Sequence, residues 1–167
     1  MGSNISEQGE TQQVLDAVRR IVQALRESSR QAERRVGLTS AQLFVLQKLA
    51  ESPASSVNEL AAMTHTHQSS VSVVVRKLAQ QGLVRNTRSA VDGRRVELTL
   101  SSRGRRAAAR VPDLAQARLV DAVARLTTAR RRQLASTLGE VARTLAGHDR
   151  VPAMFFEERR TRRTPRA

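Results

Sequence analysis

The 167-residue chain contains no cysteine, tryptophan or tyrosine, and only three phenylalanines. Without cysteine, the sequence excludes disulfides, zinc–thiolate sites, thiol redox switches and cysteine nucleophiles. Because aromatic residues make up 2% of the chain, its core has to be built from Leu, Val, Ala and Met. With 40% hydrophobic residues, a chain of this length can bury the core of one ordinary domain.

Long apolar runs are also missing. No stretch approaches the roughly 20 apolar residues of a membrane span, and no secretory signal opens the sequence. We therefore expect a cytoplasmic protein with no membrane partner. The sequence has no Ser-His-Asp set with a supporting motif, no glycine-rich phosphate loop and no carboxylate pair on one helix face. We predict that the protein is not an enzyme and needs no cofactor.

Positive charge is what the chain has in excess. It carries 29 Lys and Arg against 15 Asp and Glu, a net charge of +14, with a pI near 11.8. Such a charge favours polyanions, with nucleic acid as the leading candidate, although a basic soluble protein is the simpler alternative. Lys48 and Lys77 are the only lysines. The arginine fork suits phosphates and guanine edges, but a GC-rich genome would give the same bias.

The first half of the sequence has a helical pattern. Residues 1–10 are polar and we expect them to be frayed. Apolar residues then recur with helical spacing over residues 14–25, and Gly37 is expected to end this first helix. Thr39 with Gln42 has the spacing of a capping box that opens a second helix.

A second capping box, Ser56 with Glu59, predicts a short helix over VNELAAM. After the turn THTH, a further helix is expected from Gln68 to about Gln81, ending at Gly82. Its predicted buried face is apolar and consists of Val71, Val74, Val75 and Leu78. Two helices joined by so short a turn indicate a helix-turn-helix.

The period of the pattern then changes from helix to strand. RVELTL alternates apolar and polar residues, residues 83–88 are its expected partner, and Asp92–Gly93 is a hairpin signal. Ser101 is expected to cap a long helix that Pro112 kinks or divides. Thr127 opens a last helix, ended by Gly147, with leucines and a valine on one face. The predicted fold is mostly α with a small β-hairpin wing.

One face of the helix from Gln68 has the make-up of a DNA-reading surface. Short polar side chains stand near its N-terminus, a valine can touch a thymine methyl, and cations lie further along. The residues concerned are Gln68, Ser69, Ser72, Val73, Arg76 and Lys77. A solvated polar face, common on surface helices, is the alternative.

The charge of the neighbouring segment favours DNA. Residues 76–110 contain ten basic residues and two acids, so their net charge is 10 − 2 = +8. Arg88, Arg94 and Arg95 fall in or beside the hairpin loop, and an arginine suits the negative potential of a narrow minor groove. Asp92 can hold Arg94 in an inserting pose through a charge-assisted hydrogen bond; alternatively, Asp92 only forms the turn.

These segments resemble the MarR family of winged-helix bacterial transcription regulators. The resemblance covers residues 10–147 and rests on ELAAMTHTHQSSVSVVVRKLAQQGLVRN and on the wing motif DGRRVELTLSSRGR. It implies that Arg94 is the wing arginine and Asp92 its partner acid. The turn departs from the family pattern, because members usually have Gly and an apolar residue where this chain has His65 and Thr66.

The resemblance also implies an organisation of the chain as one domain over residues 1–167. A winged helix-turn-helix lobe covers 39–101, a helical dimerisation lobe covers 10–37 and 102–147, and a basic tail covers 148–167. We expect a homodimeric, sequence-specific regulator of double-stranded DNA, with a repressor as the first choice, acting on a pseudo-palindromic operator. The rivals are a non-specific architectural DNA-binding protein and a winged-helix module for protein contacts.

Regulation by a small-molecule effector is common in the family. Ser28, Ser29, Phe44 and Gln47 are the candidates for the lining of such a site, between the two lobes. His65 and His67 form an H-x-H, but no third ligand lies nearby in the sequence, so capping, turn formation or phosphate contact is favoured over a metal.

Overall fold

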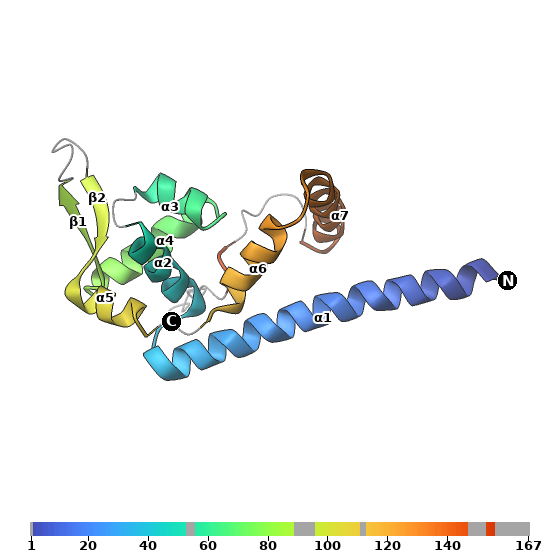
Figure 1. Cartoon of the computed structure of the whole chain (residues 1–167), viewed down its shortest axis with the longest axis horizontal. Coiled ribbons are helices and arrows are strands. Elements are labelled where there is room, and N and C mark those ends of the chain that lie inside the picture. The colour runs from blue at the N-terminus through green and yellow to red at the C-terminus, as the bar shows by residue number, and fades with distance from the viewer. Residues whose placement is uncertain (1, 53–55, 89–95, 111–112, 147–152, 156–167) are drawn as a thin grey trace, which may run out of the picture.

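The computed structural model describes residues 2–52, 56–88, 96–110, 113–146 and 153–155. Within these ranges the chain is helical apart from one antiparallel hairpin (Figure 1). In chain order the elements are α1 (Gly2–Val36), α2 (Ser40–Glu51), α3 (Val57–Met63), α4 (Gln68–Gln80), β1 (Val84–Arg88), β2 (Val96–Leu100), α5 (Ser102–Ala108), α6 (Ala115–Ala124) and α7 (Thr128–Ala146). None of these helices is both long and apolar enough to cross a membrane.

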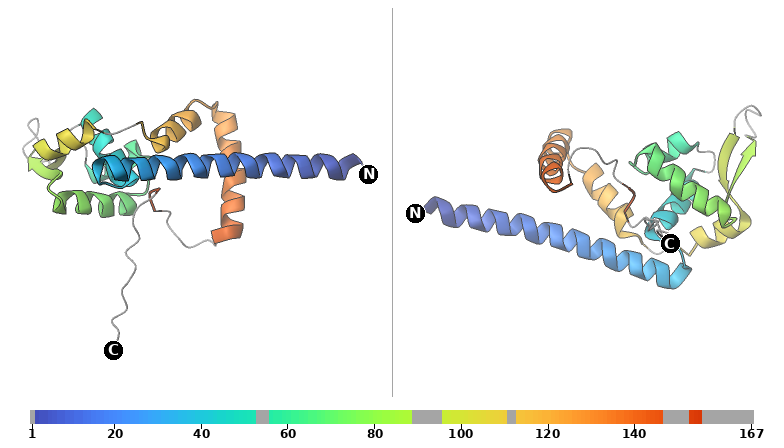
Figure 2. Two further views of the ribbon diagram at one scale, coloured as in Figure 1. Left: turned by 90° about the horizontal axis from the view of Figure 1, so that it is seen from below. Right: turned by 180° about the vertical axis from the view of Figure 1, so that it is seen from behind.

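Helix α1 is longer than the apolar pattern predicted. It starts at Gly2, so the expectation of a frayed segment over residues 1–10 is wrong. Glutamate and glutamine are good helix formers, and a glycine inside a helix, such as Gly9, costs only about 1 kcal/mol, so nothing in this segment stops a helix. Its end is as expected: Gly37 has a φ of 72° and donates its N–H to Glu33 O. The N-terminal part of α1 extends far beyond the rest of the molecule (Figures 1 and 2).

The core is centred on α2, which is buried on nearly every side. The expected stripe of Leu43, Leu46 and Leu49 is buried, and Phe44 and Val45 are fully buried as well. Helix α2 packs against α1, α3, α4, α5, α6 and β2. Both predicted capping boxes, at Thr39 and at Ser56, are present with reciprocal hydrogen bonds. The sequence therefore predicted the start of each of these helices.

The helix after the hairpin is divided, as expected near Pro112. Helix α5 ends at Ala108 and α6 begins at Ala115. Ser101 caps α5, because its hydroxyl accepts the N–H of Gly104 at 2.9 Å. Residue 112 itself lies outside the described ranges.

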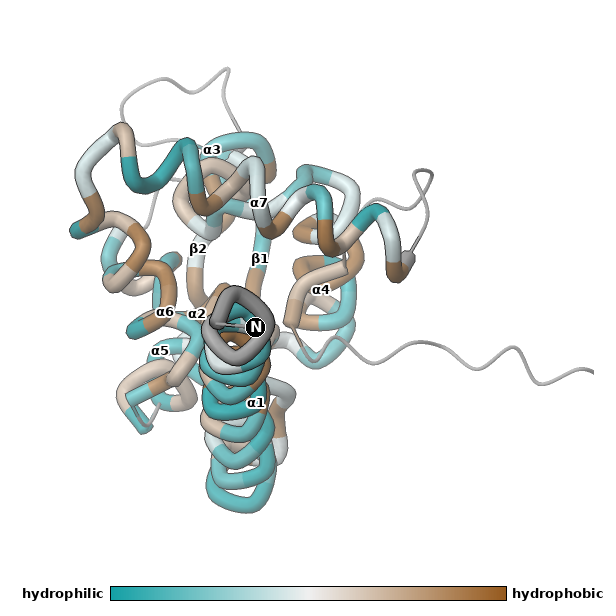
Figure 3. The backbone as a smooth tube through the Cα atoms, turned by 90° about the vertical axis from the view of Figure 1, so that its right-hand side faces the viewer, coloured by the Kyte–Doolittle hydropathy of each residue, from teal (hydrophilic) through white to brown (hydrophobic). Residues whose placement is uncertain are grey.

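The apolar faces of α1 and α7 are exposed. Apolar segments recur along both helices between hydrophilic ones (Figure 3). On α7 they are Leu134, Leu138, Val141 and Leu145; on α1 they are Val14, Leu15, Val18, Ile21 and Val22. The helical periodicity was read correctly in both helices, but these side chains contribute nothing to the core of the single chain.

Near the C-terminus, a short described segment returns to the core. Met154 is 4% exposed and belongs to the buried cluster, whereas Phe155 is exposed. In the sequence, Met154, Phe155 and Phe156 form an apolar cluster within a basic tail. Phe156 lies outside the described residues.

Candidate nucleic-acid interface

The turn between α3 and α4 sets the direction of α4. Thr64 is buried and its hydroxyl bonds to Leu60 O at 2.8 Å, while the Thr66 N–H bonds to Ala61 O at 3.0 Å. His65 has a φ of 49°, in the left-handed region that favours glycine. This conformation explains why the family usually has glycine here. His67 is the N-cap of α4, but its side chain makes no capping bond, so the capping role considered for it is wrong.

Valine at position 65 is expected to strain this turn. A β-branched side chain disfavours a positive φ, so His65→Val should lower the free energy of unfolding by about 1–2 kcal/mol. The matched control is His67→Val, since His67 is also exposed but has an extended backbone with φ −68° and ψ 140°. Urea unfolding of both variants tests this, and equal losses would contradict a strained residue 65.

Helix α4 is held by one face and presents the other. The four residues of the predicted face are buried: Val71, Val74, Val75 and Leu78. Ser70 is buried too, which the sequence did not suggest.

The opposite face of α4 carries all six residues predicted to meet DNA. Gln68, Ser69, Val73 and Arg76 are exposed, and Ser72 and Lys77 are half-buried. Val73 is an apolar side chain that remains 38% exposed beside polar ones. One surface therefore combines hydrogen-bonding groups, an apolar contact and cations, which is the mixture needed to read base edges.

The hairpin stands directly after α4. Strands β1 and β2 pair antiparallel from Val84↔Leu100 to Arg88↔Val96. Leu98 and Leu100 are buried, as the alternation predicted. Arg88 is exposed at the far end of β1. The other three wing residues, Asp92, Arg94 and Arg95, lie outside the described residues.

A backbone contact at the base of the hairpin fixes the wing to the end of α4. Leu83 O accepts the N–H of Ser101 at 3.0 Å, and the Ser101 hydroxyl donates to Gly82 O at 2.7 Å. Gly104 lies so close to the Leu83 carbonyl that a Cβ would collide with it. The sequence reading quoted this glycine only as part of the wing motif and missed its packing role.

The candidates for an effector site come from α1 and α2. Ser28 and Gln47 are half-buried, Ser29 is buried, and Phe44 is fully buried in the core. The Ser28 hydroxyl accepts the N–H of Ala115, at the start of α6, at 3.0 Å. This bond ties α1 to the start of α6.

Gln116 on α6 is a further polar residue at this junction that the sequence reading missed. It is 3% exposed, and its side-chain oxygen, like that of Gln47, has no hydrogen-bond partner among the described residues. No pattern in the sequence marks it, because burial of this glutamine depends on how α6 packs.

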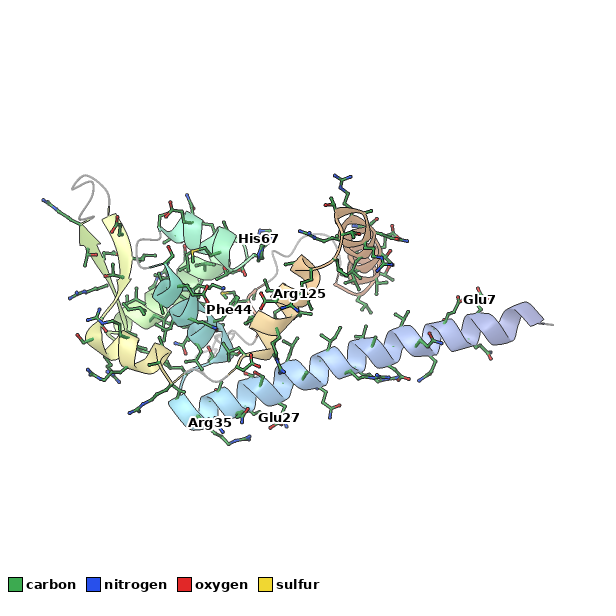
Figure 4. The ribbon with its side chains drawn as sticks, in the orientation of Figure 1. Glu7, Glu27, Arg35, Phe44, His67 and Arg125 are labelled. Carbon is green, nitrogen blue, oxygen red and sulfur yellow. The ribbon has the colours of Figure 1, made fainter. Side chains whose placement is uncertain are left out.

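The described residues contain no group of three or more His, Asp and Glu that could hold a metal ion. His65 and His67 are both exposed (for His67, see Figure 4). They flank Thr66 in the turn between α3 and α4.

Comparison with known proteins agrees with this geometry. A model of the MarR family matches residues 36–95. The HTH-type transcriptional repressor Rv2887 of Mycobacterium tuberculosis is 34% identical over 98 residues, which cover 59% of this chain and 70% of that protein.

Solved structures show the same fold. BpsR of Bordetella bronchiseptica, whose DNA binding is regulated by 6-hydroxynicotinic acid, is 25% identical with a TM-score of 0.51; the match covers 77% of this chain and 92% of that one. A MarR family protein from Bacillus stearothermophilus is 20% identical with a TM-score of 0.51, covering 82% and 96%. On these matches and on the helix-turn-helix and hairpin described above, the chain belongs to the MarR family of transcription regulators.

Proposed function

We propose that the protein is a homodimeric regulator, with a repressor as the first choice, that binds a pseudo-palindromic operator in the cytoplasm. The observation that carries this proposal is the exposed face of α4, anchored by Val71, Val74 and Leu78 and standing beside a basic hairpin. In a symmetric dimer the two α4 helices would enter successive major grooves, with centres about 34 Å apart. The wings, through Arg94 held by Asp92, would meet the flanking minor grooves.

The exposed apolar stripes of α1 and α7 support a dimer. Exposed apolar side chains that line up along two helices mark an interaction surface, because such patches are costly to leave in water. The five apolar residues on α1 and the four on α7 would bury one another in a two-fold arrangement. The terminal helices would then set the spacing of the two recognition helices.

We propose that an effector acts at the junction of α1, α2 and α6. These three helices pack on one another, and Ser28, Ser29, Phe44, Gln47 and Gln116 lie there largely or wholly buried. Two buried amide oxygens without partners favour a ligand that donates hydrogen bonds, such as a hydroxylated aromatic acid. Because the residues are shielded from solvent, entry of a ligand would require the helices to separate, which would alter the dimer spacing.

Variants of the wing should lose affinity for all DNA sequences, whereas variants of α4 should change the preference for one sequence over another. Arg94→Ala should weaken binding to all sequences alike and should reduce the slope of log affinity against log salt concentration by about 1. The reason is that an arginine held by the phosphates or the minor groove contributes charge and does not read base edges. Arg76→Ala or Ser72→Ala should instead change the preferred operator, with about 1–3 kcal/mol lost on the best site for a lost base contact. Gel shifts across salt concentrations and operator variants separate the two effects.

Arg132→Ala is the charge-matched control for these variants, because Arg132 is exposed on α7. This control variant should change neither the operator preference nor the overall DNA affinity and its salt dependence. If every variant lost affinity and sequence preference to the same degree, the assigned roles would be wrong.

Competitor DNA distinguishes the proposal from its two rivals. A specific regulator protects an intergenic site from nuclease in the presence of bulk DNA, whereas an architectural protein is displaced from any site equally. A module for protein contacts should not need the wing arginines at all. Protection of a site beside the protein's own gene would support the proposal most directly.

A further inference from the structure

A cavity of about 450 Å³ lies where the end of α1, the end of α4 and helix α5 meet. Its lining is dominated by arginines from separate parts of the chain: Arg35, Arg103, Arg106 and Arg110. Arg35 stands at the C-terminal end of α1 (Figure 4). No acidic residue of the described ranges lines this cavity. Glu33 lines a neighbouring cavity, which shares Gly37 and Gln81 with this one. Four cations from two segments, the end of α1 and α5 with the turn after it, thus surround one hollow, outside the residues that we assign to DNA.

Three of the four guanidinium groups have no protein partner within the described ranges. Arg103 donates to Gln81 O at 3.3 Å. Among the residues that the structure describes, no side-chain hydrogen bond or ion pair engages the guanidinium of Arg35, Arg106 or Arg110. The adjacent Arg34 does have a carboxylate, because it pairs with Glu27 at 3.3 Å. The cavity therefore gathers positive charge that the described part of the chain does not neutralise, and mutual repulsion favours a bound anion.

A simpler explanation for these arginines is that their positive charges balance the partial negative charges at the C-terminal ends of helices. The carbonyl ends of α1 and α4 point toward this region, and each carries a partial charge of roughly −0.5. Two such ends balance about one of four positive charges. Arg103 fulfils this role through its bond to Gln81. The remaining excess of about three charges needs another explanation.

We propose that this cavity binds a compact anion with two or three linked phosphate groups, such as the polyphosphate chain of a nucleotide. Arginine forks bind phosphate oxygens through paired hydrogen bonds, and several forks suit several linked phosphates. The volume is that of a small-ligand site rather than of a single ion. The polar, cationic lining does not suit an apolar aromatic effector, which we assign to the buried junction of α1, α2 and α6.

The position of the cavity favours a free polyphosphate over the DNA backbone. Its lining includes Gln81 and Leu83, at the C-terminal end of α4 and the base of the hairpin. On the hairpin, the proposed DNA surface lies at the opposite end, beyond Arg88. On α4 it begins at Gln68 and runs along the outward face as far as Lys77, one turn before Gln81. The base of the hairpin and its far end point in different directions (Figure 1).

An anion held there would join α1 to the end of α4. Helix α1 belongs to the proposed dimer interface and α4 to the proposed DNA surface, so such a bridge would restrict how the two lobes move. This consequence rests on the proposed function, whereas the binding site itself does not. A phosphate-bearing ligand would then change operator affinity without touching the DNA surface.

Isothermal titration of the full chain with inorganic triphosphate at about 0.15 M salt tests the site, since surface attraction is screened there. The variant Arg106→Gln/Arg110→Gln should lose affinity by about 10-fold or more, because it removes two charge-assisted contacts. The control Arg130→Gln/Arg132→Gln removes the same charge from exposed positions on α7 and should change affinity by less than about 2-fold. All four arginines are exposed, so thermal melting should show both variants folded.

Three results would overturn the site: no binding of triphosphate to the wild type, equal losses in both double variants, or orthophosphate binding as tightly as triphosphate. A second titration on protein saturated with DNA separates the two sources of phosphate. Triphosphate should still bind; complete exclusion by DNA would mean that these arginines hold the DNA backbone. The first titration contains no DNA, so it tests the anion site even if the protein proves to bind no specific operator.

Discussion

Gly104→Ala is expected to destabilise the fold by about 2–4 kcal/mol. The added Cβ would meet the backbone carbonyl of Leu83 well inside van der Waals contact. That carbonyl cannot move freely, because it accepts the N–H of Ser101. The gain of about 1 kcal/mol from alanine in a helix is too small to offset the collision. For a chain of this size, the melting temperature should fall by about 5–15 °C.

Gly9→Ala is the matched control, since Gly9 is also inside a helix and a Cβ there would meet nothing within 4 Å. It should leave stability unchanged or slightly higher. Both variants should be melted at one protein concentration, because dimerisation would couple stability to concentration. A Gly104→Ala protein as stable as the control would mean that α5 does not press against the end of α4, and that the base of the wing is not fixed there.

Leu138→Asp is expected to convert the protein to a monomer and to lower operator affinity by at least about 100-fold. Leu138 lies in the middle of the exposed apolar stripe of α7. A carboxylate buried there would lack a partner and would cost more than the apolar contact it replaces. In a dimer, binding of the second half-site is linked to binding of the first, and this linkage typically raises affinity by about 10²–10⁴-fold. A monomer loses that gain. Light scattering with size exclusion measures the mass, and gel shifts measure the affinity.

Ser136→Asp introduces the same charge on the opposite face of α7, where Ser136 is exposed. It should remain a dimer and keep the affinity of the wild type. Loss of the dimer in both variants would point to damage to the helix rather than to the stripe. A wild-type protein that is already a monomer would remove the basis for the operator proposed above.

Local sequence signals predicted the secondary structure closely. Thr39 and Ser56 each carry a capping-box partner three residues on, and both helices begin there. The change of period from residue 82 onward predicted the hairpin, and the apolar positions of α4 predicted its buried face. These features depend on interactions between residues a few positions apart, so the sequence alone contains them.

The same signals did not tell buried helices from exposed ones. The apolar stripe of α7 resembles that of α2 in the sequence, yet α2 is buried on nearly all sides and the stripe of α7 is exposed. Periodicity gives the direction of an apolar face but not what covers it. A helix face covered by a partner chain and a helix face covered by the chain's own core show the same apolar periodicity in the sequence.

The sequence by itself determined the family, the positions of most helix starts, the hairpin and the residues on the outward face of α4. Only the tertiary structure decided that Gly104 presses on Leu83, and that four arginines surround one cavity. It also decided that the buried side-chain oxygen of Gln116 has no hydrogen-bond partner among the described residues. Each of these depends on elements that are distant in sequence, such as the end of α1 and helix α5. Such contacts depend on how distant elements pack together, and this packing produces no periodic pattern in the sequence.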